Sequence, residues 1–172
     1  EVKMAKYKVL VLMHESLIPP EKFKKEEYLS ADWKTEFDVM QTLKELGHEV
    51  KPLGIIGNLE LLRNALEDFK PHIVFNLLEE FDGNPTFDQH IVSYLELKKQ
   101  AYTGCNPRGL TLARDKALSK KILTYHRIPV PKFFTFPKNQ RIKNSKKYFY
   151  PLIVKSTTEE SSTGIAQASV VS

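Results

Sequence analysis

The first hundred residues alternate short apolar runs with segments of helical periodicity, and this alternation restricts the fold more than any other feature. Tyr7-Lys-Val-Leu-Val-Leu-Met13 is nearly continuous in apolar residues, as in a strand that is buried on both faces. We expect further strands at 48–53, 73–77 and 101–103. Strands that alternate with helices predict an α/β fold with an open, mostly parallel sheet and right-handed crossovers.

The helices between these strands carry their own start and stop signals. Asp32 is expected to cap a helix that Gly47 closes, and Asn58 a second helix that reaches Phe69. A third helix is expected over 87–97, after turn residues at 81–85. The apolar stripe of the first helix is Trp33, Phe37, Met40, Leu43 and Leu46.

In such sheets, ligands bind beyond the carboxyl ends of the strands. The sequence places His14 and Glu15 after the first strand, the region beyond Leu53 after the second, residues 78–83 after the third, and 104–106 after the fourth. These segments are therefore the candidate ligand-binding edge of the first domain.

From about Thr111 the pattern changes. Asp115 is expected to cap a helix that reaches His126, and strands are expected at 133–136, 152–155 and 165–171. A helix followed by antiparallel strands predicts the opening of an α+β domain. We therefore divide the chain into a first domain at 1–110 and the start of a second at 111–172.

Composition excludes several classes of protein. Hydrophobic residues make up 41% and charged residues 27%, and no apolar run reaches the length of a membrane span. The N-terminus lacks the apolar core of a signal peptide, and Cys105 is the only cysteine, which fits a reducing cytoplasm. The net charge of +5 gathers in the basic loop 138–147, which we interpret as a solvated loop in preference to a nucleic-acid site. The histidines show no metal-ligand spacing.

The segment near the C-terminus has the composition of a phosphate site. The apolar run Leu152-Ile-Val154 leads to Lys155, and a loop of hydroxyl residues with Gly164 follows. A fixed positive charge beside hydroxyls and backbone N–H groups suits the phosphates of a nucleotide. The alternative is an ordinary hairpin loop, which serine, threonine and glycine would fill in any case.

An ordered set of motifs resembles the ATP-grasp ligases, in particular the D-alanine–D-alanine ligase branch. The set runs from Tyr102-Thr-Gly104 through a small-residue turn to Asp115-Lys116 and Ser119-Lys120. It continues with Ile128-Pro-Val-Pro131, the Pro-Leu-Ile-Val-Lys155 strand and Ser161-Ser162-x-Gly164. The first hundred residues match the family mainly in topology.

The resemblance implies a Rossmann-like pre-ATP-grasp domain followed by the beginning of an ATP-grasp domain. The chain would be the N-terminal portion of an ATP-dependent carboxylate–amine ligase that forms a peptide-type bond through an acyl phosphate. The implied cofactors are ATP and Mg²⁺, with the magnesium ligands expected beyond Ser172. The implied partners are an amino acid or small carboxylate and an amine, and the family admits a homodimer. The isolated 172-residue chain is expected to be inactive.

The resemblance also implies individual roles. Lys116 and Lys155 would contact ATP, and Glu15 and Ser161 would be catalytic-site residues, with Glu15 holding the amino group of the substrate. The lid over the phosphates would contain Ser161, Ser162 and Gly164. An exposed lysine at 116 and a solvated acid at 15 remain the alternatives for those positions.

Two departures from the family pattern keep rival functions open. Leu77-Leu78-Glu79-Glu80 stands where the family has His-Gly, and Glu160 stands where it has a glycine before the serines. The main alternative is a non-catalytic nucleotide-binding or regulatory module on the same fold. An unrelated α/β enzyme, such as a methyltransferase or a dehydrogenase, is disfavoured because Gly-x-Gly-x-x-Gly is missing after the first strand.

Overall fold

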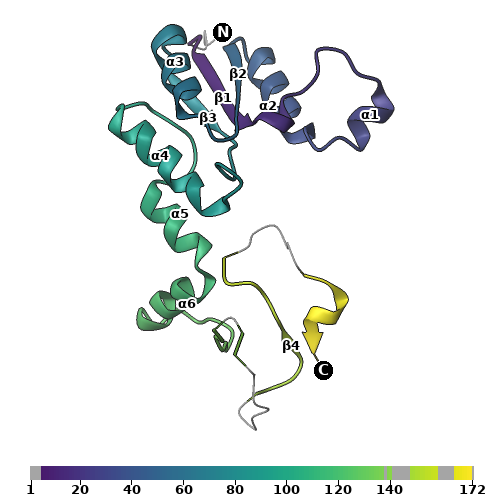
Figure 1. Cartoon of the computed structure of the whole chain (residues 1–172), viewed down its shortest axis with the longest axis vertical. Coiled ribbons are helices and arrows are strands. Elements are labelled where there is room, and N and C mark those ends of the chain that lie inside the picture. Colours follow the sequence, from purple (N-terminus) through teal and green to yellow (C-terminus); the bar gives the residue numbers. More distant parts are fainter. Residues whose placement is uncertain (1–4, 138, 141–147, 159–164, 172) are drawn as a thin grey trace. The chain divides into compact units, whose positions relative to one another are not determined.

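The computed structural model describes residues 5–137, 139–140, 148–158 and 165–171. The chain divides into two compact units, Glu1–Arg108 (unit 1) and Gly109–Ser172 (unit 2), which are described separately below. Figure 1 shows the helices and strands of both units along the chain.

Unit 1 is built on a parallel sheet of three strands in the order β2-β1-β3. The strands are β1 (Lys8–His14), β2 (Glu49–Ile55) and β3 (Ile73–Asn76), and Val9 of β1 pairs with Val50 on one side and Ile73 on the other. After β2 the chain crosses to the opposite side of β1. The chain therefore adds β2 on one side of β1 and β3 on the other. The carboxyl ends of β1 and β3 are the topological switch point of the sheet.

Helices cover both faces of this sheet. The helices of unit 1 that do so are α2 (Lys34–Glu45), α3 (Leu59–Phe69) and α4 (Asp88–Leu97). Leu10 and Leu12 of β1 pack with residues of α3 and α4, whereas Val11 and Met13 pack with Met40 of α2. Alternate residues of β1 thus belong to opposite cores, as the two-residue period of a strand requires. The α/β class and the parallel sheet predicted from the sequence are confirmed.

Several local predictions for unit 1 need correction. Asp32 does not cap α2, because Trp33 occupies the N-cap position without a side-chain hydrogen bond. The expected strand at 101–103 is reduced to one parallel bridge between Val74 and Tyr102. Before α2 the chain forms the short helix α1 (Lys25–Leu29), which the sequence analysis did not predict and which lies on an excursion away from the sheet in Figure 1.

An aromatic cluster holds this excursion against the start of α2. Phe23 lies 4.8 Å from both Trp33 and Phe37, measured between ring centroids. The hydroxyl of Tyr28 donates a hydrogen bond of 2.6 Å to Asp38. These contacts give the segment a small apolar cluster of its own, separate from the two cores of the sheet.

Unit 2 contains two helices and a short antiparallel strand pair among its described residues. The helices are α5 (Pro107–Arg114), which begins in unit 1, and α6 (Lys116–Tyr125). The strands are β4 (Leu152–Ile153) and β5 (Val170–Val171), with the 3₁₀ turn Gln167–Ser169 before β5. The expected strand at 133–136 is not formed, and the one expected over 165–171 is confined to its last two described residues.

The described side chains of unit 2 are mostly accessible. Arg114 is the only described residue of this unit that is buried, while Phe149, Ile153 and Val154 are each more than half exposed. The strands predicted from apolar runs therefore have few described neighbours to pack against. Without burial on at least one face, β propensity alone does not extend a strand.

Among the described helices of both units, none is both long and apolar enough to cross a membrane.

Candidate functional site

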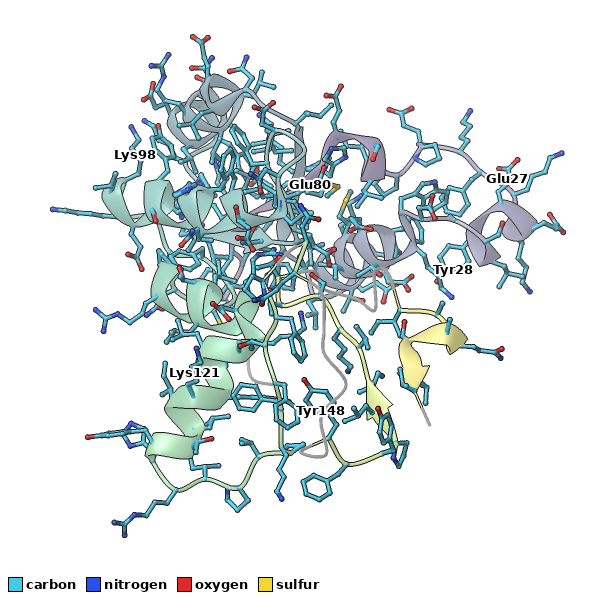
Figure 2. All side chains as sticks on the ribbon, turned by 60° about the horizontal axis from the view of Figure 1, so that its bottom comes forward. Glu27, Tyr28, Glu80, Lys98, Lys121 and Tyr148 are labelled. Atoms are coloured by element: carbon cyan, nitrogen blue, oxygen red, sulfur yellow. The ribbon has the colours of Figure 1, made fainter. Side chains whose placement is uncertain are left out.

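The carboxyl end of β1 carries His14 and Glu15, and hydrogen bonds fix the orientation of the histidine. The backbone N–H of Ser16 donates to His14 Nδ1 at 3.3 Å, so Nδ1 is an acceptor. The other ring nitrogen, Nε2, lies 3.5 Å from Glu80 Oε1. Glu80 is labelled in Figure 2. This contact links the end of β1 to the segment after β3 across the switch point.

Glu15 begins a 3₁₀ turn, Glu15–Leu17, that rests directly on β2. A Cβ atom at Gly54 would lie 2.7 Å from Glu15 Cα and 2.5 Å from Ile18 Cδ1. Only glycine permits this approach, which fixes the backbone of Glu15 at the edge of the sheet. The side chain of Glu15 is exposed there, at the place where the family resemblance predicts a substrate-binding glutamate.

The segment after β3 forms the expected turn and is tied to the end of β2. Asp82 and Gly83 both have positive φ, and Phe81 and Asn84 form an antiparallel bridge. The backbone N–H of Asp82 donates to the carbonyl of Ile56 at 2.8 Å. The predicted turn is confirmed, and the segments that follow the three strands form one connected edge.

Glu36 is a residue at this edge that the sequence analysis missed. It lies in the first turn of α2, is only 5% exposed, and its Oε2 atom has no hydrogen-bond partner. Burial is the largest cause that raises the pKa of Glu36 above its ordinary value. A hydrogen bond to its own backbone opposes this, and the charge of Glu79 raises the pKa further. The sequence offered one sign of this burial: Glu36 is an acid one turn before Met40, on the apolar stripe of α2.

The Tyr102-Thr-Gly104 motif completes the sheet beside β3. The hydroxyl of Thr103 accepts a 3.0 Å hydrogen bond from the backbone N–H of Asn76, and the hydroxyl of Tyr102 donates one of 2.8 Å to Glu96. Burial, followed by the hydrogen bond to Glu96, raises the pKa of Tyr102 to about 12, so the phenol stays protonated. The contacts of this motif in unit 1 are therefore structural.

Unit 2 brings the segments of two predicted ATP ligands together. Asp115 caps α6 as expected, since its side chain accepts hydrogen bonds from the N–H groups of Ala117 and Leu118. The backbone N–H of Lys116 donates to the carbonyl of Thr157 at 3.1 Å. Lys155, two residues before Thr157, is exposed and follows β4 rather than ending it. Ser161, Ser162 and Gly164 lie outside the described residues.

A search of the described residues for a metal site gives a negative result. No group of three or more His, Cys, Asp or Glu side chains in that part of the chain could hold a metal ion. The family resemblance places the magnesium ligands beyond Ser172, so this observation does not test them.

Comparison with known proteins identifies relatives of this chain. No family model matches the chain. An uncharacterised protein of Sinorhizobium fredii is 32% identical over 74% of this chain and 38% of its own length. The D-alanine–D-alanine ligase of Aquifex aeolicus is 33% identical over 77% of this chain and 43% of its own length.

A solved structure agrees in fold. The D-alanine–D-alanine ligase of Bacillus anthracis, in a complex with ATP, superposes with a TM-score of 0.63 over 88% of this chain and 48% of that one, at 21% identity. This chain is a relative of the D-alanine–D-alanine ligases. It spans about two fifths of the length of the curated relatives described above, 38% and 43% of them. The resemblance inferred from the motifs is thereby confirmed.

Proposed function

We propose that the chain is the N-terminal portion of an ATP-dependent carboxylate–amine ligase. In this proposal residues 1–110 form the pre-ATP-grasp domain, and 111–172 form part of the ATP-grasp domain. ATP supplies the phosphoryl group that activates a carboxylate as an acyl phosphate, and an amine then displaces phosphate to give a peptide-type bond. A cytoplasmic location and a homodimer belong to the same proposal.

The hydrogen bond between Lys116 and Thr157 is the observation that best supports nucleotide binding. It joins the N-terminal turn of α6 to the segment that carries Lys155. Lysine is unfavourable in the first turn of a helix because it adds to the positive end of the dipole, and a bound anion would reverse this effect. We therefore assign both lysines to the phosphates of ATP, where each ammonium would make a charge-assisted contact.

The edge of the sheet in unit 1 supports an amine-bearing substrate. Glu15 is exposed on a backbone that its contact with Gly54 fixes, so its carboxylate can accept hydrogen bonds from an ammonium group. We assign the amino group of an amino-acid substrate to Glu15. Magnesium would need ligands other than the described residues, and no step is assigned to it.

Binding of ATP to the chain and to three lysine variants tests the nucleotide site. Loss of a charge-assisted phosphate contact of about 1.5–3 kcal/mol corresponds to roughly a ten- to hundredfold weaker affinity. We expect this loss in Lys116→Ala and Lys155→Ala, with little change in apo melting temperature. Lys121→Ala is the matched control, because Lys121 is an exposed lysine of the same helix α6 (Figure 2).

Unchanged ATP affinity in both test variants would remove the two lysines from the nucleotide site. A large fall in melting temperature with affinity retained would show that they act in folding. ATP-dependent coupling of an amino acid by a ligase-length protein carrying this chain, but not by its Lys155→Ala form, would separate the ligase from a non-catalytic nucleotide-binding module.

A further inference from the structure

Ser16, His14 and Glu80 form a series of side-chain contacts at the carboxyl edge of unit 1 that the proposed ligase function does not use. The hydroxyl of Ser16 lies 2.7 Å from His14 Nδ1, and His14 Nε2 lies 3.5 Å from Glu80 Oε1. A hydroxyl, an imidazole and a carboxylate in this order are the arrangement that activates a serine as a nucleophile. Such a site is defined by the geometry of its contacts, whatever the order of its residues in the sequence.

The basic nitrogen of His14 faces the hydroxyl of Ser16. Nδ1 also accepts the backbone N–H of Ser16 at 3.3 Å, so its lone pair is directed toward this residue. A ring nitrogen in this position can take the proton of the hydroxyl when the serine oxygen attacks a substrate. The separation of 2.7 Å lies within the range for direct proton transfer to a general base.

The carboxylate of Glu80 supplies the third part of the arrangement from the segment after β3. The 3₁₀ turn Glu15–Leu17 accounts for the contact between Ser16 and His14, but it does not require a carboxylate at the other ring nitrogen. A negative charge there stabilises the positive charge that the ring gains with the serine proton. The side chains of His14 and Glu80 are 23% and 37% exposed, so water screens part of this stabilisation.

The sheet of unit 1 fixes the backbone of these residues and leaves the serine accessible. His14 is the last residue of β1 and is paired with β2. Gly54 of β2 closely approaches Glu15 and Ile18, which flank Ser16 in the turn. Ser16 itself is exposed, so a substrate can reach its oxygen without a change in the fold.

We propose that Ser16 is a nucleophile that cleaves carboxylic esters, with His14 as its general base and Glu80 as a positioning residue. The Ser16 oxygen forms a bond to the acyl carbon of the ester while its proton moves to His14 Nδ1. The bond from the acyl carbon to the leaving oxygen breaks, and that oxygen takes the proton from His14. Water then attacks the acyl carbon by the same route, which releases the carboxylic acid and restores the Ser16 hydroxyl. Aryl esters are the favoured substrates, because a phenolate is a stable leaving group. This activity goes beyond the proposed ligase function.

Labelling of the 172-residue chain with an alkyl fluorophosphonate, without ATP, tests the nucleophile. This probe forms a stable bond to an activated serine oxygen and releases fluoride, and peptide mass spectrometry locates the bond. We expect a label on Ser16. His14→Gln should slow the labelling at least about a hundredfold, because the general base is lost. Ser30→Ala is the matched control, since Ser30 is another exposed serine of unit 1, and Ser16 should be labelled in it at the wild-type rate.

Hydrolysis of p-nitrophenyl acetate tests the role of Glu80. Glu80→Gln should lower the maximal rate about two- to fivefold, as expected for loss of a partly exposed ion pair. The ester concentration at half the maximal rate should stay unchanged, since Glu80 does not touch the substrate. Glu80→Asp keeps the charge and should restore part of the rate. Circular dichroism of each variant checks that the fold is kept.

Absence of a label on Ser16, or labelling of Ser16 no faster than that of Ser30, would overturn the nucleophile in the folded wild-type chain. Ester hydrolysis that survives unchanged in Ser16→Ala would overturn it as well, because imidazole and lysine side chains would then account for the rate. Equal losses in Glu80→Gln and Glu80→Asp would overturn the positioning role of Glu80. These measurements use neither ATP nor an amino acid, so their failure is distinguishable from failure of the proposed ligase function.

Discussion

Units 1 and 2 differ in how their apolar residues are used. Every buried apolar side chain among the described residues belongs to unit 1, whereas the described part of unit 2 buries Arg114 alone. Burial of apolar area is the main favourable contribution to folding, so we expect unit 1 to generate most of the folding free energy of this chain. The proposed nucleotide segments lie in the unit whose described contacts stabilise it less.

The sharpest test of this difference is a pair of truncations, one in a strand of each unit. Leu12 of β1 is fully buried, whereas Ile153 of β4 is 52% exposed. Leu12→Ala should lower the free energy of unfolding by about 3 kcal/mol through lost burial and a cavity. Ile153→Ala should change it by less than about 0.5 kcal/mol. Chemical denaturation followed by circular dichroism measures both, and similar losses would end the distinction between the units.

A second pair of variants, at two glycines of unit 1, tests which contacts fix the backbone at the carboxyl edge of the sheet. Gly54→Ala places a methyl group 2.7 Å from the backbone at Glu15, and we expect it to destabilise the chain by about 2 kcal/mol. Gly57→Ala meets the side chain of Asp82, whose terminal Oδ1 is the nearest atom at 2.8 Å and can move, so its effect should be smaller. Thermal denaturation compares the two variants. If Gly57→Ala proves the more harmful, the turn at Glu15 is not fixed by its contact with β2.

Helix caps give a matched comparison between the units. Asn58 caps α3 in unit 1, where its side-chain oxygen accepts a hydrogen bond from the backbone N–H of Glu60, and Asp115 caps α6 in unit 2 by accepting from two backbone N–H groups. Replacement of either residue by alanine should reduce local helix stability by about 1 kcal/mol. Asn58→Ala should lower the main melting transition, whereas Asp115→Ala should chiefly weaken ATP binding. Amide exchange of α3 and α6 reports each effect, and an unaltered ATP affinity in Asp115→Ala would count against the nucleotide site.

The smallest expected effect is the pH dependence that Glu36 confers on unit 1. Its pKa is raised in the folded state, so folding favours the protonated form, and the contribution to stability falls as pH rises above the ordinary value of 4.5. Glu36→Gln cannot ionise, and its stability should therefore improve relative to the wild type between acidic and neutral pH. The charge of Glu79 acts on Glu36, so the stability of a Glu79→Gln variant should be measured over the same pH range. A stability difference that is independent of pH would show that Glu36 is not perturbed.

The sequence predicted the parts of the fold that local chemistry determines. The strand at 7–13 and the caps at Asn58 and Asp115 follow from an apolar run and from side chains that accept backbone hydrogen bonds, and all three are present within a residue or two. These features need no knowledge of distant residues. Helix α5 was not predicted. Its sequence does carry a start signal, Asn106-Pro107, since proline is favoured in the first turn of a helix.

The incorrect predictions concern features that tertiary neighbours determine. Phe133-Phe-Thr-Phe136 has high β propensity, but no described strand pairs with it. The carboxyl of Glu36 became notable only when the fold buried it, where the charge of Glu79 also raises its pKa. Of the candidate site, sequence patterns predicted the carboxyl edge of the sheet. The roles of Lys116 and Lys155 stay predictions, and the serine lid at 161–164 lies outside the described residues.

The strand order β2-β1-β3 has a consequence for how the protein is made. The central strand β1 is synthesised first, yet the hydrogen bond from Lys8 to His72, beside its last partner, spans 64 residues. At about 5–20 residues per second, ribosomes need several seconds to supply both neighbours. Until β2 is made, Val9-Leu-Val-Leu-Met13 has both edges unpaired, and one edge stays unpaired until β3 follows, so the nascent chain is a candidate client for chaperones that bind short apolar segments.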